Sequence, residues 1–315
     1  MDVIESIARV AGRLPKGYSK IGDDVAAVPP RAGKLIVKVD MLVEHTDVPR
    51  GMTYRQAARK AVAMCVSDFA AKGARPDSFM VSLGLRRGVT QGQIDELARG
   101  FKDAGMEWKV HLMGGDTNES QELVIDCAMV GFAKGIVGRR GARPEDVLIV
   151  TGPFGYPPAG LRILRDGAAF SPWFGKKARS SVLRPNPSLE VGWALAPYLS
   201  SAMDSSDGLA RSIHALAGAS GVGFELTALP MGEGVEEFAA TNGLRADELI
   251  LEGGEEYLIV GTANRSKIEA AKEAARRAGG QLIEIGRATS QTGRVKLRTG
   301  GKTISIRNVG WTHLG

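Results

Sequence analysis

The sequence predicts an α/β protein of two domains, and three observations lead to this expectation. The chain has 315 residues, which exceeds the size that one hydrophobic core usually serves. Strand and helix patterns alternate along the first half. A stretch rich in Gly, Arg and Pro over residues 134–146 then interrupts the alternation. We therefore expect one domain over residues 1–135 and another over residues 136–315.

The first domain is expected to open with a short amphipathic helix. Acids at Asp2 and Glu5 and the lack of a continuous apolar run distinguish this segment from a signal peptide. A later helix begins at a plausible Thr90 cap, with Gln93 three residues on. The patterns predict strands over residues 34–39, 78–85, 110–113 and 123–132 and helices over residues 54–73 and 90–104.

The second domain is expected to mix strands and helices. Its Gly/Pro loop at residues 152–160 is only a weak candidate for phosphate binding, because it matches no complete glycine-rich motif. Residues 166–187 are expected to form a surface insertion with a short helix. Strands are predicted over 147–151, 249–251, 257–262, 281–285 and 303–306, and helices over 159–165, 188–199, 209–220 and 267–278.

The charge distribution favours an anionic small molecule over a nucleic acid. The formal net charge is +6, but Lys and Arg are interleaved with Asp and Glu along the chain. The densest basic stretches, residues 272–277 and 294–302, lack the interleaved aromatic residues that stack on bases. We expect these stretches to be solvated surface and the substrate to be a nucleotide or phosphate ester.

Cysteine usage and hydropathy point to the cytoplasm. Cys65 and Cys127 are far apart and in apolar company, so they form neither a disulfide framework nor a zinc site. No apolar stretch approaches the roughly 20 residues that span a bilayer. We expect a cytoplasmic protein with no membrane partner.

Acidic residues recur in glycine-rich segments at positions where the strand and helix patterns do not require them. Each alone could be a turn residue or a helix cap. Asp68 is harder to explain in this way, because it interrupts an apolar helix and a buried carboxylate is costly unless it is paired or metal-bound. The acids in question are Asp23, Asp24, Asp40, Asp68, Asp116, Asp204, Asp207, Glu255 and Glu256.

Together these acids indicate magnesium and ATP. Two carboxylates about 4 Å apart repel by roughly 4 kcal/mol at an effective dielectric of about 20, so a cluster needs cations. Oxygen donors without nearby His or Cys select Mg²⁺, and neighbouring glycines let backbone N–H groups approach phosphates. The chain has no Walker A motif, no kinase catalytic loop and no catalytic triad. The residues therefore favour a magnesium-dependent enzyme that works on ATP by other means.

Seven segments resemble the landmarks of the thiamine-monophosphate kinases, in the superfamily of aminoimidazole ribonucleotide synthetase. The resemblance runs almost from end to end. It implies a two-domain aminoimidazole ribonucleotide synthetase-like fold with mixed sheets and packed helices, and a homodimer built by the sheets of the N-terminal domains. The segments, in their usual order, are GDDVA (22–26), VSDFAAKGARP (66–76), GGDTN (114–118), RRGARPED (139–146), MDSSDGL (203–209), GGEEY (253–257) and GWTHL (310–314).

The resemblance also implies the reaction and the roles of single residues. The family transfers a phosphoryl group from ATP to thiamine monophosphate, in line and with several Mg²⁺ ions, and yields thiamine diphosphate. The N-terminal domain would bind ATP and metal. By position, Asp24, Asp40, Asp68, Asp116, Asp204 and Asp207 resemble metal ligands, Gly115, Arg139 and Ser206 resemble ATP contacts, and Glu255 and Trp311 resemble thiamine-facing residues.

Two positions depart from the family pattern. Many members have Ser-Thr before the strand-end aspartate, where a hydroxyl helps to hold metal, whereas this chain has Lys38 and Val39. A protonated lysine cannot ligate Mg²⁺, so Lys38 is a candidate to contact a phosphate and replace one ion. A substrate-contacting His of the family falls near Asp47, so either Asp47 or His45 is the candidate for that role.

Other functions stay open at this point. An aminoimidazole ribonucleotide synthetase-like enzyme with another substrate would share the segment at 66–76, although GGEEY and GWTHL favour the kinase. A catalytically inactive nucleotide-binding scaffold would explain Lys38. A basic RNA-binding protein is a third reading. The cysteines that selenophosphate synthetase and the hydrogenase-maturation relative require are absent from the expected places.

Overall fold

The chain forms two compact units. The computed structural model describes residues 3–11, 14–18, 26 and 28–312. Unit 1 comprises Met1–Val66 with Ala74–Gly135, and unit 2 comprises Ser67–Gly73 with Ile136–Gly315. Two α/β domains were predicted and are confirmed. The sequence did not indicate that the seven residues Ser67–Gly73 pack with the second unit.

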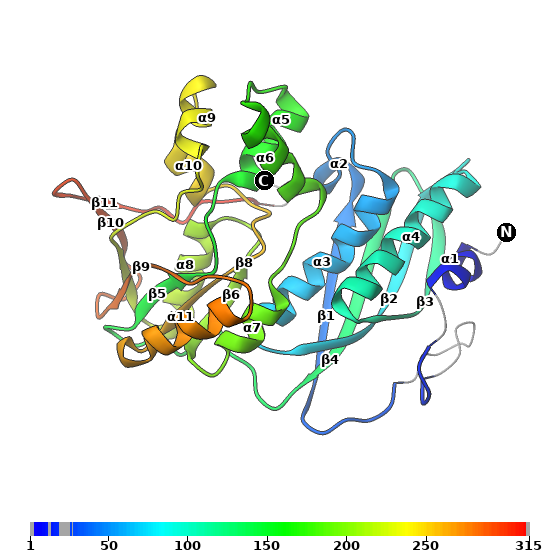
Figure 1. Cartoon of the computed structure of the whole chain (residues 1–315), viewed down its shortest axis with the longest axis horizontal. Helices are drawn as coiled ribbons and strands as arrows, with labels where there is room; N and C mark the ends of the chain where they lie inside the picture. The colour runs from blue at the N-terminus through cyan, green and yellow to red at the C-terminus, as the bar shows by residue number, and fades with distance from the viewer. Residues whose placement is uncertain (1–2, 12–13, 19–25, 27, 313–315) are drawn as a thin grey trace. The chain divides into compact units, whose positions relative to one another are not determined.

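Unit 1 is a four-stranded sheet with helices on one face (Figure 1). The strand order is β1-β4-β2-β3, in which β2 and β3 are parallel and the other pairs antiparallel. The predicted N-terminal helix and the capping box of Thr90 and Gln93 are both present. The elements are α1 Val3–Ala11, β1 Lys34–Val43, α2 Glu44–Asp47, α3 Tyr54–Lys72, β2 Arg75–Arg86, α4 Gln91–Trp108, β3 His111–Ser120 and β4 Val124–Ala133.

The two faces of this sheet differ sharply. On one face α3 packs against β4, where the Cys65 thiol donates to the Cys127 carbonyl over 3.2 Å. A side chain at Gly100 of α4 would lie 2.2 Å from the Arg55 carbonyl oxygen, so the glycine allows α3 and α4 to approach closely. The opposite, open face carries a row of apolar side chains along β1, which are 53–63% exposed: Leu35, Val37, Val39 and Met41.

Unit 2 is a seven-stranded mixed sheet in the order β11-β10-β7-β9-β5-β8-β6. Only β10 and β7 are parallel. The strands are β5 Val147–Val150, β6 Leu199–Ser205, β7 Gly223–Leu226, β8 Leu258–Ala263, β9 Ile283–Thr289, β10 Val295–Thr299 and β11 Lys302–Ser305. The helices are α5 Tyr156–Asp166, α6 Pro172–Leu183, α7 Leu189–Leu195, α8 Leu209–Ser220, α9 Val235–Thr241, α10 Ala246–Leu251 and α11 Ile268–Arg277, with a 3₁₀ turn at Arg265–Lys267.

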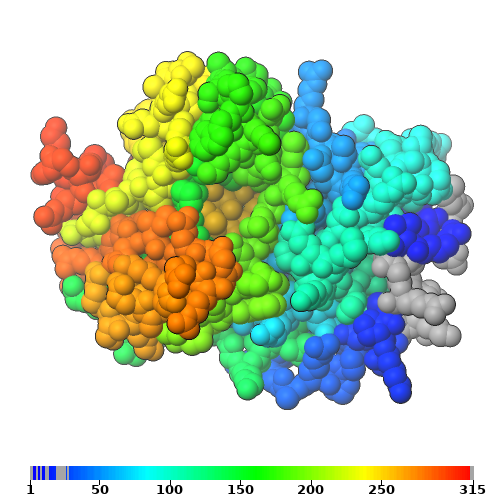
Figure 2. Space-filling model, viewed as in Figure 1, coloured from blue at the N-terminus to red at the C-terminus, as the bar shows by residue number. Residues whose placement is uncertain are grey.

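Helices cover both faces of the second sheet. Central strand β5 is buried on both sides: Val147 and Ile149 pack with α7 and α11, whereas Leu148 and Val150 pack with α8. A strand enclosed in this way needs a continuous apolar run, which explains its sequence. A third cluster of buried side chains joins α5, α6, α9 and α10, whose surfaces are the green and yellow parts at the top of Figure 2.

Several predicted elements need correction. The strand predicted at 249–251 is wrong: these residues end helix α10, whose first turn carries Asp247 and Glu248. A short apolar run fits a buried strand or one helical turn equally well, and here the acids near the helix N-terminus favour the helix. The insertion at 166–187 contains the twelve-residue helix α6, which buries Phe174. Strands β6, β7 and β10 and helices α2 and α9 were not predicted.

No helix in the described part of the chain is both long and apolar enough to cross a bilayer. Both cysteines are buried and free. The hydrogen bond to Cys127 and burial raise the pKa of the Cys65 thiol well above its usual value, so Cys65 offers no reactive thiolate at neutral pH.

Candidate active site

Strand β6 and the end of helix α3 form the centre of the site in unit 2. Asp204, near the end of β6, is only 6% exposed. Its Oδ2 accepts a hydrogen bond from the Ser67 hydroxyl at 2.9 Å. Two residues earlier on the strand, the Ala202 carbonyl accepts from Lys72 Nζ at 2.5 Å. These two bonds fix the segment that carries Asp68 against the strand that carries Asp204.

Two cations lie within electrostatic range of the two carboxylates. Burial first and the nearby Arg139 guanidinium second lower the pKa of Lys72 to about 8, although Asp204 and Asp68 act in the opposite direction. Charges that influence one another in this way share a small region. The arrangement offers carboxylate oxygens for a metal and two cationic groups for phosphate. Lys72 is a residue that the sequence reasoning missed, although a lysine within the apolar run FAAKGA was a usable signal.

The loop after β6 is interlocked with the segment around Glu255. The Glu255 N–H donates to the Ser206 carbonyl at 2.7 Å. A Cβ at Gly254 would lie 2.6 Å from that same oxygen, and Gly208, at φ +113°, would bring one within 2.9 Å of the Leu251 carbonyl. Only glycine permits these approaches. The two predicted segments MDSSDGL and GGEEY are therefore neighbours in space.

The predicted C-terminal aromatic residue reaches the same loop. The Trp311 N–H donates to the Asp207 carbonyl at 3.0 Å, and the Trp311 side chain is 43% exposed. A side chain at Gly310 would lie 2.2 Å from that carbonyl oxygen. Unit 2 thus brings together Ser206, Asp207, Glu255 and Trp311, which are about a hundred residues apart from first to last in the sequence.

The backbone around Glu256 is unusual. Glu255 and Tyr257 both have positive φ, at 64° and 50°, a backbone conformation that residues other than glycine seldom adopt. The Glu256 side chain between them is buried, and its Oε1 accepts from the Gly155 N–H at 2.6 Å. Burial raises the pKa of Glu256 to about 8, and the Gly155 bond opposes this only in part. Glu256 therefore joins the start of α5 to the Glu255 segment.

In unit 1 the predicted metal ligands lie on different faces of the sheet. Asp40 pairs in register with Cys127, on the face that α3 covers. Asp116 pairs with Ser82, which pairs in turn with Asp126 on the open face. The Asp116 Oδ1 accepts from the N–H of the next residue at 2.8 Å. A Cβ at the neighbouring Gly115 would lie 2.0 Å from a backbone oxygen of β2, which accounts for glycine there.

Asp40 is already charge-paired. Lys38 Nζ lies 2.9 Å from Asp40 Oδ1, and the two side chains are 31% and 22% exposed. The predicted contact between Lys38 and a phosphate remains a prediction, but the structure gives this ammonium group a carboxylate partner. Asp24, the remaining predicted metal ligand, lies outside the described residues.

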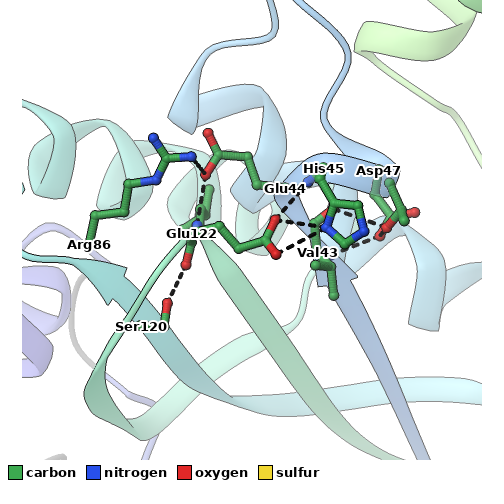
Figure 3. Close-up of polar contacts among 9 residues, drawn as sticks. Val43, Glu44, His45, Asp47, Arg86, Ser120 and Glu122 are labelled. Carbon is green, nitrogen blue, oxygen red and sulfur yellow. Dashed lines mark hydrogen bonds and ion pairs between the residues drawn. The ribbon is translucent and has the colours of Figure 1, made fainter.

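His45 lies at an exposed corner between β1 and the loop that connects β3 to β4 (Figure 3). Its ring Nδ1 is 3.0 Å from both carboxylate oxygens of Glu122, and its N–H donates to Glu122 at 2.8 Å. These contacts, the main-chain bond first, lower the pKa of Glu122. Beside them Glu44 accepts from the Leu123 N–H at 2.7 Å and pairs with Arg86 at 3.1 Å. The His45 side chain is 71% exposed and can meet a ligand.

The Asp47 carboxylate accepts hydrogen bonds within its own turn. Its Oδ2 accepts from the Val43 N–H at 2.7 Å and from the Thr46 hydroxyl at 2.9 Å. The Asp47 carbonyl accepts from Lys60 Nζ at 2.7 Å, and Lys60 is almost completely buried. A carboxylate oxygen that caps a turn in this way holds the corner in shape, which leaves His45 as the more accessible of the two candidates.

The donors at the centre of unit 2 fit Mg²⁺ in chemistry. Asp68 and Asp204, and Asp207 in the loop that follows β6, carry carboxylate oxygens of the kind that a hard divalent ion prefers. Among the residues that the structure describes, no group of three or more His, Cys, Asp or Glu side chains could hold a metal on its own. Water and phosphate oxygens would therefore complete the coordination, as is usual for Mg²⁺ at nucleotide sites.

Comparisons with known proteins place these features in a family. Residues 22–133 match the AIR synthase related protein, N-terminal domain, and residues 143–298 match the AIR synthase related protein, C-terminal domain. The chain is 37% identical over 279 residues to the thiamine-monophosphate kinase of Nitrosopumilus maritimus, and the match covers 89% of each chain.

Solved structures agree. The thiamine-monophosphate kinase from Stenotrophomonas maltophilia K279a has a TM-score of 0.83 at 27% identity, over 92% of this chain and 94% of that one. AaThiL complexed with AMPPCP and TMP has a TM-score of 0.80 at 29% identity, over 93% of this chain and 92% of that one. Of the predicted site residues, Arg139 and Trp311 fall outside the two stretches that match the family domains.

Proposed function

The chain belongs to the thiamine-monophosphate kinases of the AIR synthase-related family, and we propose that it transfers the terminal phosphoryl group of ATP directly to thiamine monophosphate with the help of Mg²⁺. One observation carries the residue-level proposal. The loop at Ser206 and Asp207 is hydrogen-bonded to both Glu255 and Trp311, so that positions resembling nucleotide contacts and thiamine contacts share one rigid frame.

In unit 2 Ser206 and Arg139 are the proposed nucleotide contacts, and in unit 1 Gly115 is a candidate on the family resemblance alone. A relative solved with AMPPCP, an analogue of ATP, supports a nucleotide site in this fold. Lys72 adds a second cation beside Arg139. Fixed positive groups that need no reorganisation favour the spread of negative charge in phosphoryl transfer.

Mg²⁺ is proposed at the carboxylates of Asp68, Asp204 and Asp207, with Asp116 a further candidate and Asp24 supported only by the family resemblance. When bound, Mg²⁺ neutralises phosphate charge. The Ser67 hydroxyl donates to Asp204 Oδ2 and thereby helps to orient this carboxylate. The acceptor is a phosphate, already a good nucleophile, so positioning rather than a strong general base is required.

The thiamine end would lie at Glu255 and Trp311. A carboxylate and an aromatic face both attract a cationic thiazolium ring. The left-handed backbone of Glu255 holds its side chain in a fixed place, and Glu256 anchors that backbone from the other side. At the β1–α2 corner, exposure favours His45 over Asp47 as a further substrate contact.

We also propose a homodimer in which the open face of the first sheet meets a second copy of the chain. The row Leu35, Val37, Val39 and Met41, together with Met80 on β2, is exposed and apolar. Contiguous apolar surface of this kind is uncommon on monomers and marks interfaces. The homodimer that the family resemblance implies uses the sheets of the same domain. We propose that the protein acts in the cytoplasm.

One assay tests the function. The purified protein is incubated with ATP, MgCl₂ and thiamine monophosphate, and thiamine diphosphate is measured. We expect product only when all three are present. If ATP binds but no thiamine diphosphate forms, the kinase proposal fails and a nucleotide-binding scaffold or an enzyme with another substrate replaces it.

A further inference from the structure

We propose that Lys38 takes the place of a divalent cation at Asp40, so that this carboxylate is not a metal ligand in this protein. The proposal rests on the proposed kinase function and deepens it. The ammonium group of Lys38 lies 2.9 Å from Asp40 Oδ1, at the point where sequence similarity implies a metal.

The pair is built into the strand. Lys38 and Asp40 are two residues apart on β1, so their side chains point to the same face. Their cross-strand partners in β4 are Met129 and Cys127, which are both fully buried. Because both charged side chains are partly buried, at 31% and 22% exposed, their attraction is screened less than that of a surface pair. This geometry requires no rearrangement to persist during turnover.

The surroundings of Asp40 do not suit a divalent ion. A protonated lysine has three donors and no acceptor, so it cannot be a ligand and it repels a metal cation. Val39 supplies no hydroxyl, and its side chain is exposed on the opposite face. The Cys65 thiol nearby has a raised pKa, caused first by its bond to Cys127, and a neutral thiol is a poor ligand.

The other predicted metal ligand on a strand of this sheet, Asp116, is not placed to share a cation with Asp40. Asp116 pairs with Ser82 on the open face, whereas Asp40 belongs to the covered face. Within unit 1, therefore, Asp40 meets a cation that the chain itself provides, the ammonium group of Lys38. A tethered single positive charge is always present, whereas a divalent ion must be recruited from solution.

The test counts bound metal ions directly. Full-length protein with AMPPCP and thiamine monophosphate is titrated with Mn²⁺, and bound Mn²⁺ is measured by electron paramagnetic resonance, with nucleotide alone as the blank. The variants are Asp40→Asn, Lys38→Thr and Lys38→Arg, with circular dichroism to confirm folding. Asp68→Asn reports separately on the metal ligands of the proposed function.

We expect wild type, Asp40→Asn and Lys38→Arg to bind the same number of ions, and Lys38→Thr to bind one more. Loss of one ion in Asp40→Asn would overturn the proposal, and so would an unchanged count in a folded Lys38→Thr. If Lys38→Thr does not fold, the Asp40→Asn count decides alone. Failure of the wild type to make thiamine diphosphate would refute the kinase instead and would leave these counts interpretable.

Discussion

The two units satisfy their functional carboxylates by different means. In unit 1 Asp40 is paired with a lysine, Asp116 accepts from the N–H of the next residue of β3, and Asp47 is bonded within its own turn. In unit 2 Asp204 is nearly buried and accepts from a neutral hydroxyl. The ammonium group of Lys38 already compensates the charge of Asp40, whereas the burial of Asp204 makes its negative charge costly unless a cation compensates it. We therefore expect the metal-dependent part of the reaction to depend mainly on the acids of unit 2.

The largest effect should follow from neutralising an acid of unit 2. We expect Asp68→Asn to lower kcat by about 100-fold or more, the usual cost of losing a fixed electrostatic group in an active site. The fold should persist, because the side chains have the same shape. Steady-state assays with circular dichroism check this, and Asp166→Asn on exposed α5 is the control. Near-normal turnover in Asp68→Asn would remove this residue from the site.

The open face of unit 1 should control assembly. We expect Val37→Asp to convert the dimer to a monomer, because the new charge would have to be buried at the interface. Multi-angle light scattering after size exclusion measures the mass. Lys102→Asp on the exposed face of α4 changes the net charge more and should leave the mass unchanged. A wild-type protein that is already monomeric would contradict the proposed interface.

The half-buried Lys72 of unit 2 should affect the KM for ATP more than the stability of the fold. We expect Lys72→Met to raise KM for ATP about tenfold, since a charged hydrogen bond to phosphate contributes roughly 1.5 kcal/mol or more. Methionine keeps the volume of the side chain and removes its charge. Initial rates at varied ATP measure the effect, with Lys102→Met as the matched surface control. An unchanged KM would indicate that Lys72 only holds β6 in place through its hydrogen bond to the Ala202 carbonyl and does not contact ATP.

Glu256 should make stability depend on pH. Its folded-state pKa is raised to about 8 from a usual 4.5, so the folded protein holds the proton more tightly than the unfolded chain. The stabilisation is complete below about pH 4.5 and is lost as pH rises through about 8, by at most about 1.4 kcal/mol per pH unit. Urea unfolding of wild type and Glu256→Gln over this range should show a slope only in the wild type. Parallel curves would mean that Glu256 is ionised in the fold.

The smallest effect is expected at the exposed corner of unit 1. We expect His45→Ala to raise KM for thiamine monophosphate about three- to tenfold with little change in kcat, as for the loss of one hydrogen bond. Asp47→Asn should lower the melting temperature instead, because it weakens the cap of its turn. Kinetics and thermal unfolding of both variants separate the roles. The reverse pattern would assign substrate contact to Asp47.

The sequence was sufficient where local patterns decide the outcome. Strand β1 and helix α3 follow from apolar periodicity, and the capping box at Thr90 follows from two residues three apart. The bond from Gly155 to Glu256 and that from Lys72 to Ala202 join segments over 100 residues apart, and no local pattern encodes such partners. The strand prediction at 249–251 was wrong for a related reason, because only the tertiary surroundings of this short apolar run distinguish a helix from a strand.

The division of helix α3 has a consequence for the order in which the chain can fold during synthesis. The last residues of α3 form hydrogen bonds with β6: the Ser67 hydroxyl donates to Asp204 and Lys72 donates to the Ala202 carbonyl. On the ribosome, the end of this helix emerges long before β6 exists. Its hydrogen-bonding groups and apolar side chains remain exposed to solvent until about 130 further residues have been synthesised. A fragment that stops after the first sheet would keep that surface permanently uncovered, and we expect such a fragment to aggregate or to require a chaperone.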